Sequence, residues 1–342
     1  MSEPLSNDIV YVDDQQPGIT RRKLRHGWSY QDADGTRIKD SDAIDRLNAI
    51  GLPPAYQNAW FCPDPRGHIQ ATGYDDKGRK QYRYHAAFRE AQEAAKYDRC
   101  SDFGEHLARL RARVEADLKL RGMCKEKAVA AVVRLLDLGS IRVGNEQYVQ
   151  ANKSFGATTL RKRHAVVKGQ TLRLQFRAKS GKLRVMTITD GSLSRFVKKC
   201  QDLPGQHLFR WLDDAGEAHP VTSSDVNCYI REATHEDFTA KHFRTWGASV
   251  LAFQALARGD GHVGLKAMLE PVTEALGNTP AIARKSYVHP ALIDLSKDRD
   301  AQAAWRGDLH LPRATRWLNR YERGLIAWLE GLAAHNQPRK AA

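Results

Sequence analysis

The stretch LRLQFRAKSGKLRVMTI, residues 172–188, decides how the middle of the chain folds. Apolar Leu172, Leu174 and Phe176 alternate with polar residues, which is the period of a β-strand with one buried face. Residues 178–182 have the small and polar side chains of a turn, and the remainder supplies a returning strand. The pattern therefore predicts a β-hairpin that carries several positive charges.

The sequence on both sides of this hairpin has the period of helices. Val129, Val133 and Leu136 share one helical face, and Gly139 is the expected end of that helix. An apolar stripe along residues 317–332 predicts a further helix that packs in the core. The helix with Val129 is expected at residues 125–138. The other expected helices cover residues 86–98, 104–120, 223–233, 241–258, 262–276 and 280–287.

The beginning of the chain is different, because short strands predominate there. Residues 19–40 read as strands joined by a tight turn, and residues 67–84 read as two more strands. Ser41 is the expected N-cap of one short helix. We therefore predict an α+β protein with a small, mostly β N-terminal lobe at 1–90. A larger, mainly helical domain with the inserted hairpin follows at 91–342.

The positive charge is concentrated rather than spread along the chain. Lys and Arg number 54 against 40 Asp and Glu, which gives a net charge of +14. Residues 151–200 hold thirteen Lys or Arg and one acidic residue, Asp190, so this window carries +12 of that total. Such a cluster is typical of a surface that binds a polyanion, and nucleic acid is the leading candidate. The alternative is an ordinary solvated basic face.

Length, hydropathy and cysteine use exclude several classes of protein. With 342 residues, 42% of them hydrophobic, the chain has enough apolar side chains for a packed core. No apolar run approaches roughly 18 residues, so we expect no membrane segment, and the polar, acidic N-terminus is unlike a signal peptide. The five cysteines are scattered and include no CxxC pair, which argues against disulfides and structural zinc.

No cofactor motif is convincing in its context. Gly259, Gly261 and Gly264 fit G-x-G-x-x-G, but a helical pattern precedes them where a dinucleotide loop requires a strand. An interhelical turn explains these glycines better. No G-x-x-x-x-G-K-[ST] loop occurs, no His/Cys/Asp/Glu cluster has metal spacing, and His235 and His242 form only an isolated pair. We therefore expect neither a nucleotide nor a metal cofactor.

Five residues, each in a distinctive context, carry the strongest functional signal. They are Arg142 in SIRVGNEQYVQAN, Lys179 in FRAKSGK, Arg244 in AKHFRTWGAS, Asn278 in LGNTPAIA and Tyr287 in ARKSYVHP. In this order and in these contexts they resemble the active-site set of the type IB DNA topoisomerases, of the small, poxvirus-like kind found in bacteria. The resemblance runs from about Thr20 to about Leu295 and includes GLPPAYQNAW and GYDDKGRKQYRYH.

The resemblance implies strand cleavage that needs neither ATP nor a metal. Tyr287 would attack a phosphodiester of duplex DNA and form a 3′-phosphotyrosyl ester, which stores the energy of the broken bond. Arg142 and Arg244, planar and permanently charged, would bind the non-bridging oxygens. Lys179 on the hairpin would donate a proton to the leaving 5′-oxygen. Strand rotation and religation would then relax supercoils of either sign.

Asn278 departs from the poxviral pattern, in which a His stands at this position. An amide N–H donates a hydrogen bond to a phosphate oxygen but does not titrate, so we interpret Asn278 as an oxygen-binding donor. The alternative is an N-cap for the helix that Thr279 and Pro280 open, and the two roles are compatible.

Further residues are expected to contact DNA. They are Arg79, Lys80, Gln81, Tyr82 and Tyr84 in the N-terminal lobe, and Tyr148 and Lys241 in the larger domain. Amide, phenol and cationic groups are suited to phosphates and base edges. Ordinary packing is the alternative for Tyr84 and Tyr148.

Two other functions fit parts of the pattern. A tyrosine recombinase shares the nucleophile and the arginines but usually has H-x-x-R, whereas Lys241 stands three residues before Arg244 here. A non-catalytic DNA-binding protein would keep the charge without all five residues. We therefore expect a topoisomerase that clamps double-stranded DNA between its two lobes as a monomer, in the cytoplasm and associated with the nucleoid.

Overall fold

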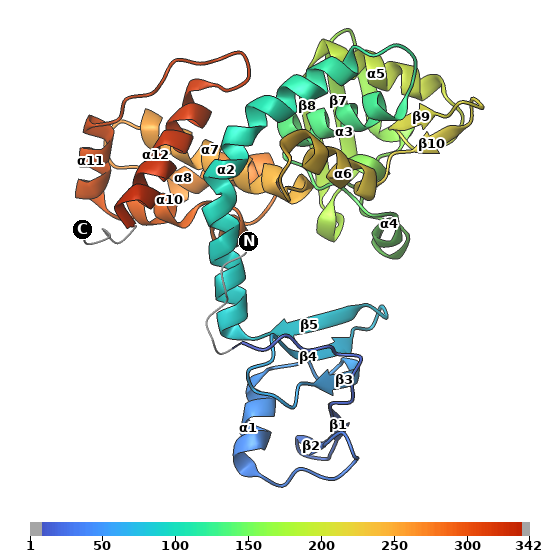
Figure 1. The fold of residues 1–342 in the computed structure, drawn as a ribbon, viewed down its shortest axis with the longest axis vertical. Helices are drawn as coiled ribbons and strands as arrows, with labels where there is room; N and C mark the ends of the chain where they lie inside the picture. Colours follow the sequence, from blue (N-terminus) through green and yellow to red (C-terminus); the bar gives the residue numbers. More distant parts are fainter. Residues whose placement is uncertain (1–8, 337–342) are drawn as a thin grey trace. The chain divides into compact units, whose positions relative to one another are not determined.

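The computed structural model describes residues 9–336, apart from the side chains of residues 93–96, 98, 147, 148, 151, 335 and 336. The chain forms two compact units, Met1–Lys96 and Tyr97–Ala342, and the boundary between them falls inside helix α2 (Ala86–Leu118). Each unit has its own hydrophobic core, so each is described by itself (Figure 1). A functional division at residue 90 stays a prediction.

The N-terminal unit is a five-stranded antiparallel sheet with one helix. The strand order is β2-β1-β3-β4-β5. Tyr30, Leu47 and Phe61 are almost fully buried at the centre of its small core. The elements are β1 (Ile19–Lys23), β2 (Trp28–Gln31), α1 (Ser41–Ala49), β3 (Gln57–Phe61), β4 (Ile69–Tyr74) and β5 (Lys80–Tyr84).

The N-cap of α1 is Asp40, so the expectation that Ser41 caps this helix is wrong. The Asp40 carboxylate accepts a hydrogen bond from Ala43 N at 2.8 Å, and Ser41 is the first helical residue. Both side chains are good N-caps. Asp40 also brings a negative charge to the positive end of the helix dipole, which favours it over the hydroxyl.

The C-terminal unit is mainly helical and, with the small N-terminal sheet, confirms the predicted α+β class. Besides α2 its helices are α3 (Lys125–Gly139), α4 (Glu146–Asn152), α5 (Gly191–Asp202), α6 (Ser223–Thr234), α7 (Ala240–Arg258), α8 (Leu265–Leu276), α9 (Pro280–Ser286), α10 (Pro290–Leu295), α11 (Arg299–Gly307) and α12 (Arg320–Asn336). The helices α3, α6, α7, α8 and α9 lie within three residues of the predicted bounds, whereas no bounds were predicted for α4, α5, α10 and α11.

Helix α2 is continuous, whereas the sequence predicts separate helices at 86–98 and 104–120. The intervening residues 99–103 include polar side chains that weaken the apolar pattern, but they include no Gly or Pro to interrupt the backbone. Cys100 and Phe103 are both buried and stand three residues apart, so they face the core from one side of an unbroken helix.

The predicted hairpin is confirmed, and a third strand joins it. Strands β6 (Ala165–Lys168), β7 (Thr171–Arg177) and β8 (Leu183–Thr189) form an antiparallel sheet in that order. Leu172 pairs with Ile188, and Leu172, Leu174 and Phe176 are buried while Arg177 is exposed. A separate pair, β9 (Arg210–Leu212) and β10 (Ala218–Pro220), forms a small hairpin of its own.

Two further expectations about packing are confirmed. The stretch with Gly259, Gly261 and Gly264 connects α7 to α8, as expected for an interhelical turn. In α12, Leu325 is buried and Trp328 packs against aromatic rings of α7 and α11. Among the helices of residues 9–336, none combines the length and apolar character that crossing a membrane requires.

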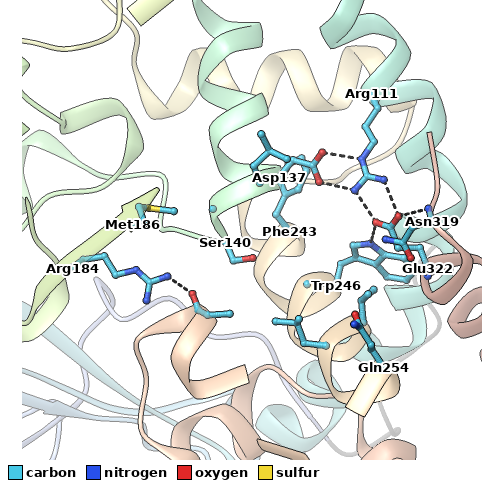
Figure 2. A pocket seen from close by; sticks show the side chains of 16 residues that line it. Arg111, Asp137, Ser140, Arg184, Met186, Phe243, Trp246, Gln254, Asn319 and Glu322 are labelled. Atoms are coloured by element: carbon cyan, nitrogen blue, oxygen red, sulfur yellow. Dashed lines mark hydrogen bonds and ion pairs between the residues drawn. The ribbon is translucent and has the colours of Figure 1, made fainter. Parts of the chain in front are cut away.

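A buried ion cluster ties several helices of this unit together. Arg111 of α2 donates to Asp137 of α3 through Nε and Nη2, both at 2.8 Å, and to Glu322 of α12 through Nη2 at 2.7 Å. The two carboxylates are only 7% and 6% exposed. Figure 2 shows the cluster on one wall of a cavity. Arg111 is thus the cation that compensates two buried negative charges.

Arg111→Met should lower the free energy of unfolding by about 3–5 kcal/mol, because it leaves both carboxylates buried without a cation. Urea denaturation followed by circular dichroism measures this effect. Lys119→Met, which breaks an exposed pair with Glu115, is the matched control and should change stability by less than about 0.5 kcal/mol. Equal losses in the two variants would contradict this account of the cluster.

Candidate active site

The structure brings the five candidate catalytic residues together within the C-terminal unit. Arg142, Lys179 and Arg244 line one small cleft. Asn278 accepts a hydrogen bond from Arg142, and the ring of Tyr287 lies beneath the guanidinium of Arg244. These residues come from the segment after α3, the β7–β8 turn, α7, the end of α8 and the end of α9.

Arg142 is held by backbone contacts with a segment that follows α4. Its carbonyl oxygen accepts a hydrogen bond from Ala157 N at 2.8 Å, and Thr158 N donates to Val143 O at 2.7 Å. Gly156 makes this close approach possible, since a Cβ there would lie 2.5 Å from the Arg142 oxygen. The contact fixes the backbone from which the Arg142 side chain reaches Asn278, with 3.3 Å between Nη2 and Oδ1.

Arg244 is a buried cation whose partners are neutral. It is 4% exposed, and burial lowers its pKa to about 10. Nη1 donates to the carbonyl oxygen of Ser140, and Nη2 donates to that of Leu276 at 3.5 Å. Ser140, at the end of α3, has a φ of 47°, in the left-handed region. Its carbonyl therefore ends the helix within reach of Arg244, which keeps its full positive charge.

Tyr287 has a phenol that is easier to ionise than usual. The guanidinium carbon of Arg244 lies 4.7 Å from the centre of its ring. Burial raises the pKa of the phenol, but the charges of Arg244 and Arg142 and the nearby Asn278 amide outweigh burial and leave that pKa below its ordinary value. The site therefore favours the phenolate, which is the nucleophilic form.

The backbone that follows the Tyr287 side chain is attached to α7. Ser249 Oγ donates to the carbonyl oxygen of Tyr287 at 3.5 Å and accepts from His289 N at 3.1 Å. Tyr287 itself is the C-cap of α9, which begins at Pro280. Arg244 and Ser249 both belong to α7, so one helix supplies both the charge above the ring and the anchor of its backbone.

Asn278 does not cap α9, so that alternative is wrong. The N-cap is Thr279, whose hydroxyl accepts from Ile282 N at 3.4 Å. Asn278 is thereby free to face the site, where its Oδ1 accepts from Arg142. Its Nδ2 is buried and has no acceptor among the residues described, and the same holds for Arg244 Nε. The site thus contains two buried donors that the protein does not satisfy.

Lys179 lies in the turn between β7 and β8, at the rim of the cleft. Ser180 and Gly181 have φ of 65° and 71°, and Ala178 N closes the turn on Lys182 O at 2.8 Å. The Lys179 side chain is exposed, and it forms no ion pair with a described residue. It is therefore an exposed cation that lines the same cleft as the two arginines.

The expected DNA contacts of the N-terminal unit fall into two groups. Lys80 pairs with Asp14 at 2.6 Å, and Arg79 and Gln81 both contact Asp75, at 2.7 and 3.0 Å. Hydrogen bonds from Arg79 lower the pKa of Asp75 to about 2. These three polar side chains are therefore engaged with carboxylates of their own unit.

Two tyrosines of β5, in contrast, present their rings to solvent. Tyr82 and Tyr84 are 40% and 45% exposed, and their rings stack with centroids 5.9 Å apart and planes inclined by 10°. Tyr84 therefore does not serve to pack the core. In the C-terminal unit, Lys241 is exposed on α7, and Tyr148 lies in α4 with its side chain outside the described part of the chain.

One group in residues 9–336 has the geometry of a metal site, which the sequence spacing did not suggest. Ligand atoms of Asp213, Glu217 and His219 lie within 4.8 Å of one another around the β9–β10 turn. Asp213 already accepts from the backbone N of Ala215 and Glu217, and a hydrogen bond of 2.7 Å joins it to His219. These bonds stabilise the turn and account for the cluster without a metal.

Sequence reasoning did not single out three residues that shape the site: Ser140, Arg184 and Ser249. Ser140 follows the expected helix end, and Ser249 closes the AKHFRTWGAS motif, so both lay in stretches already noted. Arg184 gave no signal, because it alternates like any polar residue of a strand. Its partners are carbonyl oxygens of α8, some ninety residues away in the chain.

Two known protein families match stretches of this chain. Residues 85–285 match the family described as "Eukaryotic DNA topoisomerase I, catalytic core", and residues 27–75 match "Bacterial DNA topoisomerase IB, N-terminal domain". DNA topoisomerase 1B of Acanthamoeba polyphaga mimivirus is 31% identical over 292 residues, which cover 81% of this chain and 87% of that protein. DNA topoisomerase 1B of vaccinia virus is 19% identical over 281 residues, which cover 76% and 84%.

A solved structure with partial similarity is the site-specific recombinase XerH bound to its difH substrate. It is 17% identical, with a TM-score of 0.36, over 53% of this chain and 48% of the recombinase. The catalytic-core match spans more than half of the chain, and the mimivirus protein aligns over most of both lengths. The chain therefore belongs to the type IB DNA topoisomerase family.

Proposed function

We propose that this protein relaxes supercoiled double-stranded DNA by transient cleavage of one strand, with Tyr287 as nucleophile. One observation carries the proposal: two buried donors, Asn278 Nδ2 and Arg244 Nε, lack a protein acceptor beside a phenol of lowered pKa. Buried donors are nearly always satisfied in folded proteins. The non-bridging oxygens of a phosphodiester, placed for attack by Tyr287, would satisfy both.

The covalent step conserves the energy of the phosphodiester. The Tyr287 oxygen forms a bond to phosphorus, the bond to the 5′-oxygen breaks, and a 3′-phosphotyrosyl ester remains. Negative charge develops on the non-bridging oxygens during attack. Arg142 and Arg244 oppose it at short range, and Arg244 is buried, where a fixed charge acts more strongly than in water. Religation is the same step in reverse, once the free 5′ end has rotated.

The leaving 5′-oxygen requires a proton, and Lys179 is the proposed donor. Lys179 lines the cleft with Arg142 and Arg244 and is exposed on a turn that projects from the sheet. A lysine ammonium within reach of the leaving oxygen can act as a general acid. The reaction would then need neither ATP nor a metal ion.

Both units are proposed to contact DNA, and the protein would act as a cytoplasmic, nucleoid-associated monomer. The basic window 151–200 supplies charge for phosphates, and the exposed rings of Tyr82 and Tyr84 offer stacking surfaces. Nothing in the described site favours the recombinase alternative. His242 is used in packing against Phe103 and Phe238 and accepts from Thr239 N at 3.0 Å.

Tyr287→Phe should abolish the covalent protein–DNA adduct and leave DNA affinity unchanged, since it removes one oxygen and little volume. The measurement is denaturing gel electrophoresis after incubation with a duplex labelled at the 5′ end of the cleaved strand, beside a binding titration. Tyr321→Phe, a change of the same kind in α12, is the control and should form the adduct normally. An adduct in the Tyr287 variant would assign the nucleophile to another residue.

Relaxation should persist in EDTA and without ATP, because the proposed chemistry draws every group from the protein. Magnesium should speed turnover at most modestly, through competition for phosphates during product release. A plasmid relaxation assay with and without EDTA tests this directly. Complete loss of relaxation in EDTA would rule out the mechanism.

Lys179→Ala should slow cleavage by roughly 10²–10⁴-fold, the range typical of a lost general acid. A substrate with sulfur at the 5′-bridging position should restore most of the rate, because a thiolate leaves without a proton. Lys182→Ala, in the same turn, should affect both substrates equally. If Lys179→Ala is equally slow on both, Lys179 is a phosphate contact and the acid lies elsewhere.

A further inference from the structure

The last turn of α8 is held by two arginines from different elements. Arg184 of β8 donates to the carbonyl oxygen of Glu274 through Nη1 at 2.9 Å and to that of Ala275 through Nη2. Arg244 of α7 donates to the next carbonyl, that of Leu276. The last carbonyls of a helix lack intrahelical partners and form the negative end of its dipole, so cations stabilise them.

This capped helix end leads directly into the active site. Gly277 ends α8 with a φ of 66°, and the next residue is Asn278. A Cβ at Gly277 would lie 3.1 Å from Arg184 Nη1, so the glycine serves both the left-handed backbone and the close approach of the guanidinium. Leu276 and Gly277 separate the carbonyls that Arg184 binds from Asn278, and Arg244 holds the Leu276 carbonyl independently of Arg184.

Arg184 is also close to Lys179 along the hairpin. Arg184 pairs with Phe176 across the β7–β8 ladder, and the turn that holds Lys179 lies between them. On the β7 side, Phe155 N donates to the carbonyl oxygen of Arg177 at 2.7 Å, which anchors that strand. On the β8 side, the hydrogen bonds of Arg184 attach that strand to α8. One leg of the turn is therefore fastened to the segment that contacts the Arg142 backbone, and the other to the helix that leads into Asn278.

The surroundings of Arg184 indicate that its role is not to fill the core. One side of Arg184 lines the catalytic cleft, and the other lines a cavity of about 350 Å³ next to Ser140 and Met186 (Figure 2). Figure 2 shows the side chain reaching from its strand to a carbonyl at the end of α8, where it forms a hydrogen bond. Its removal would break this tether between β8 and α8.

We propose that Arg184 is a positioning residue, which fixes the Lys179 turn against the end of α8 and so places the general acid relative to the scissile phosphate. This inference rests on the proposed function, in which Lys179 protonates the leaving group. Displacement of a reacting group by about 1 Å costs on the order of 10²-fold in rate. Loss of Arg184 should therefore slow cleavage only of substrates whose leaving 5′ atom must take up a proton.

The test compares single-turnover cleavage of oxygen and 5′-bridging sulfur substrates by the full-length protein. Arg184→Ala should slow the oxygen substrate by about 10- to 100-fold and leave the sulfur substrate near the wild-type rate. Arg184→Ala combined with Lys179→Ala should be no slower than Lys179→Ala alone, because the two residues act as one unit. Arg184→Lys keeps the charge but cannot bridge two carbonyls, so it should show the same pattern with a smaller loss.

Arg173→Ala is the matched control, since it removes a positive charge from the exposed face of the same hairpin. Any loss through DNA binding should affect both substrates equally. An equal loss on both substrates for Arg184→Ala and Arg184→Lys, or additive losses in the double variant, would overturn the inference. Failure of sulfur to rescue Lys179→Ala would instead refute the general acid itself, so the two failures are distinguishable.

Discussion

The buried guanidinium of Arg244 is the constraint on which the rest of the site depends. A permanent charge at 4% exposure is unfavourable unless its donors find partners. Those partners are the backbone carbonyls of Ser140 and Leu276, at the ends of α3 and α8, and the ring of Tyr287. Three segments must therefore meet α7 before the charge is accommodated. The site is therefore complete only when these segments have packed against α7.

The choice of partners separates structural arginines from those of the site. Arg111 is bound by the carboxylates of Asp137 and Glu322, which cancel its charge and leave it a purely structural tie. Arg244 and Arg184 are bound by neutral carbonyl oxygens. These hydrogen bonds hold the two side chains in place without cancelling their positive charge. Helix ends suit this purpose, because their free carbonyls attract cations without neutralising them.

The local pattern of apolar and polar residues was sufficient to predict an element wherever one buried face determines its structure. The alternation through Leu172, Leu174 and Phe176 predicted the hairpin, and the interhelical turn at Gly259 was read from the helical residues before it. Prediction failed where two local choices were nearly equal. Asp40 and Ser41 both cap helices well, and residues 99–103 neither favour nor forbid helix strongly. Asn278 and Thr279 were likewise both suitable N-caps for α9, and the N-cap in the structure is Thr279.

The sequence by itself determined the α+β composition, the concentration of positive charge in residues 151–200 and the five residues that mark the family. All of these are properties of residue type and order along the chain. Only the tertiary structure decided that Arg244 is buried above Tyr287, that Asn278 faces Arg142, and that Arg184 joins β8 to α8. The physical reason is that these contacts end on backbone carbonyls or on residues far apart in sequence. Every residue carries such a carbonyl, so no pattern of side chains reveals which one a distant guanidinium will bind.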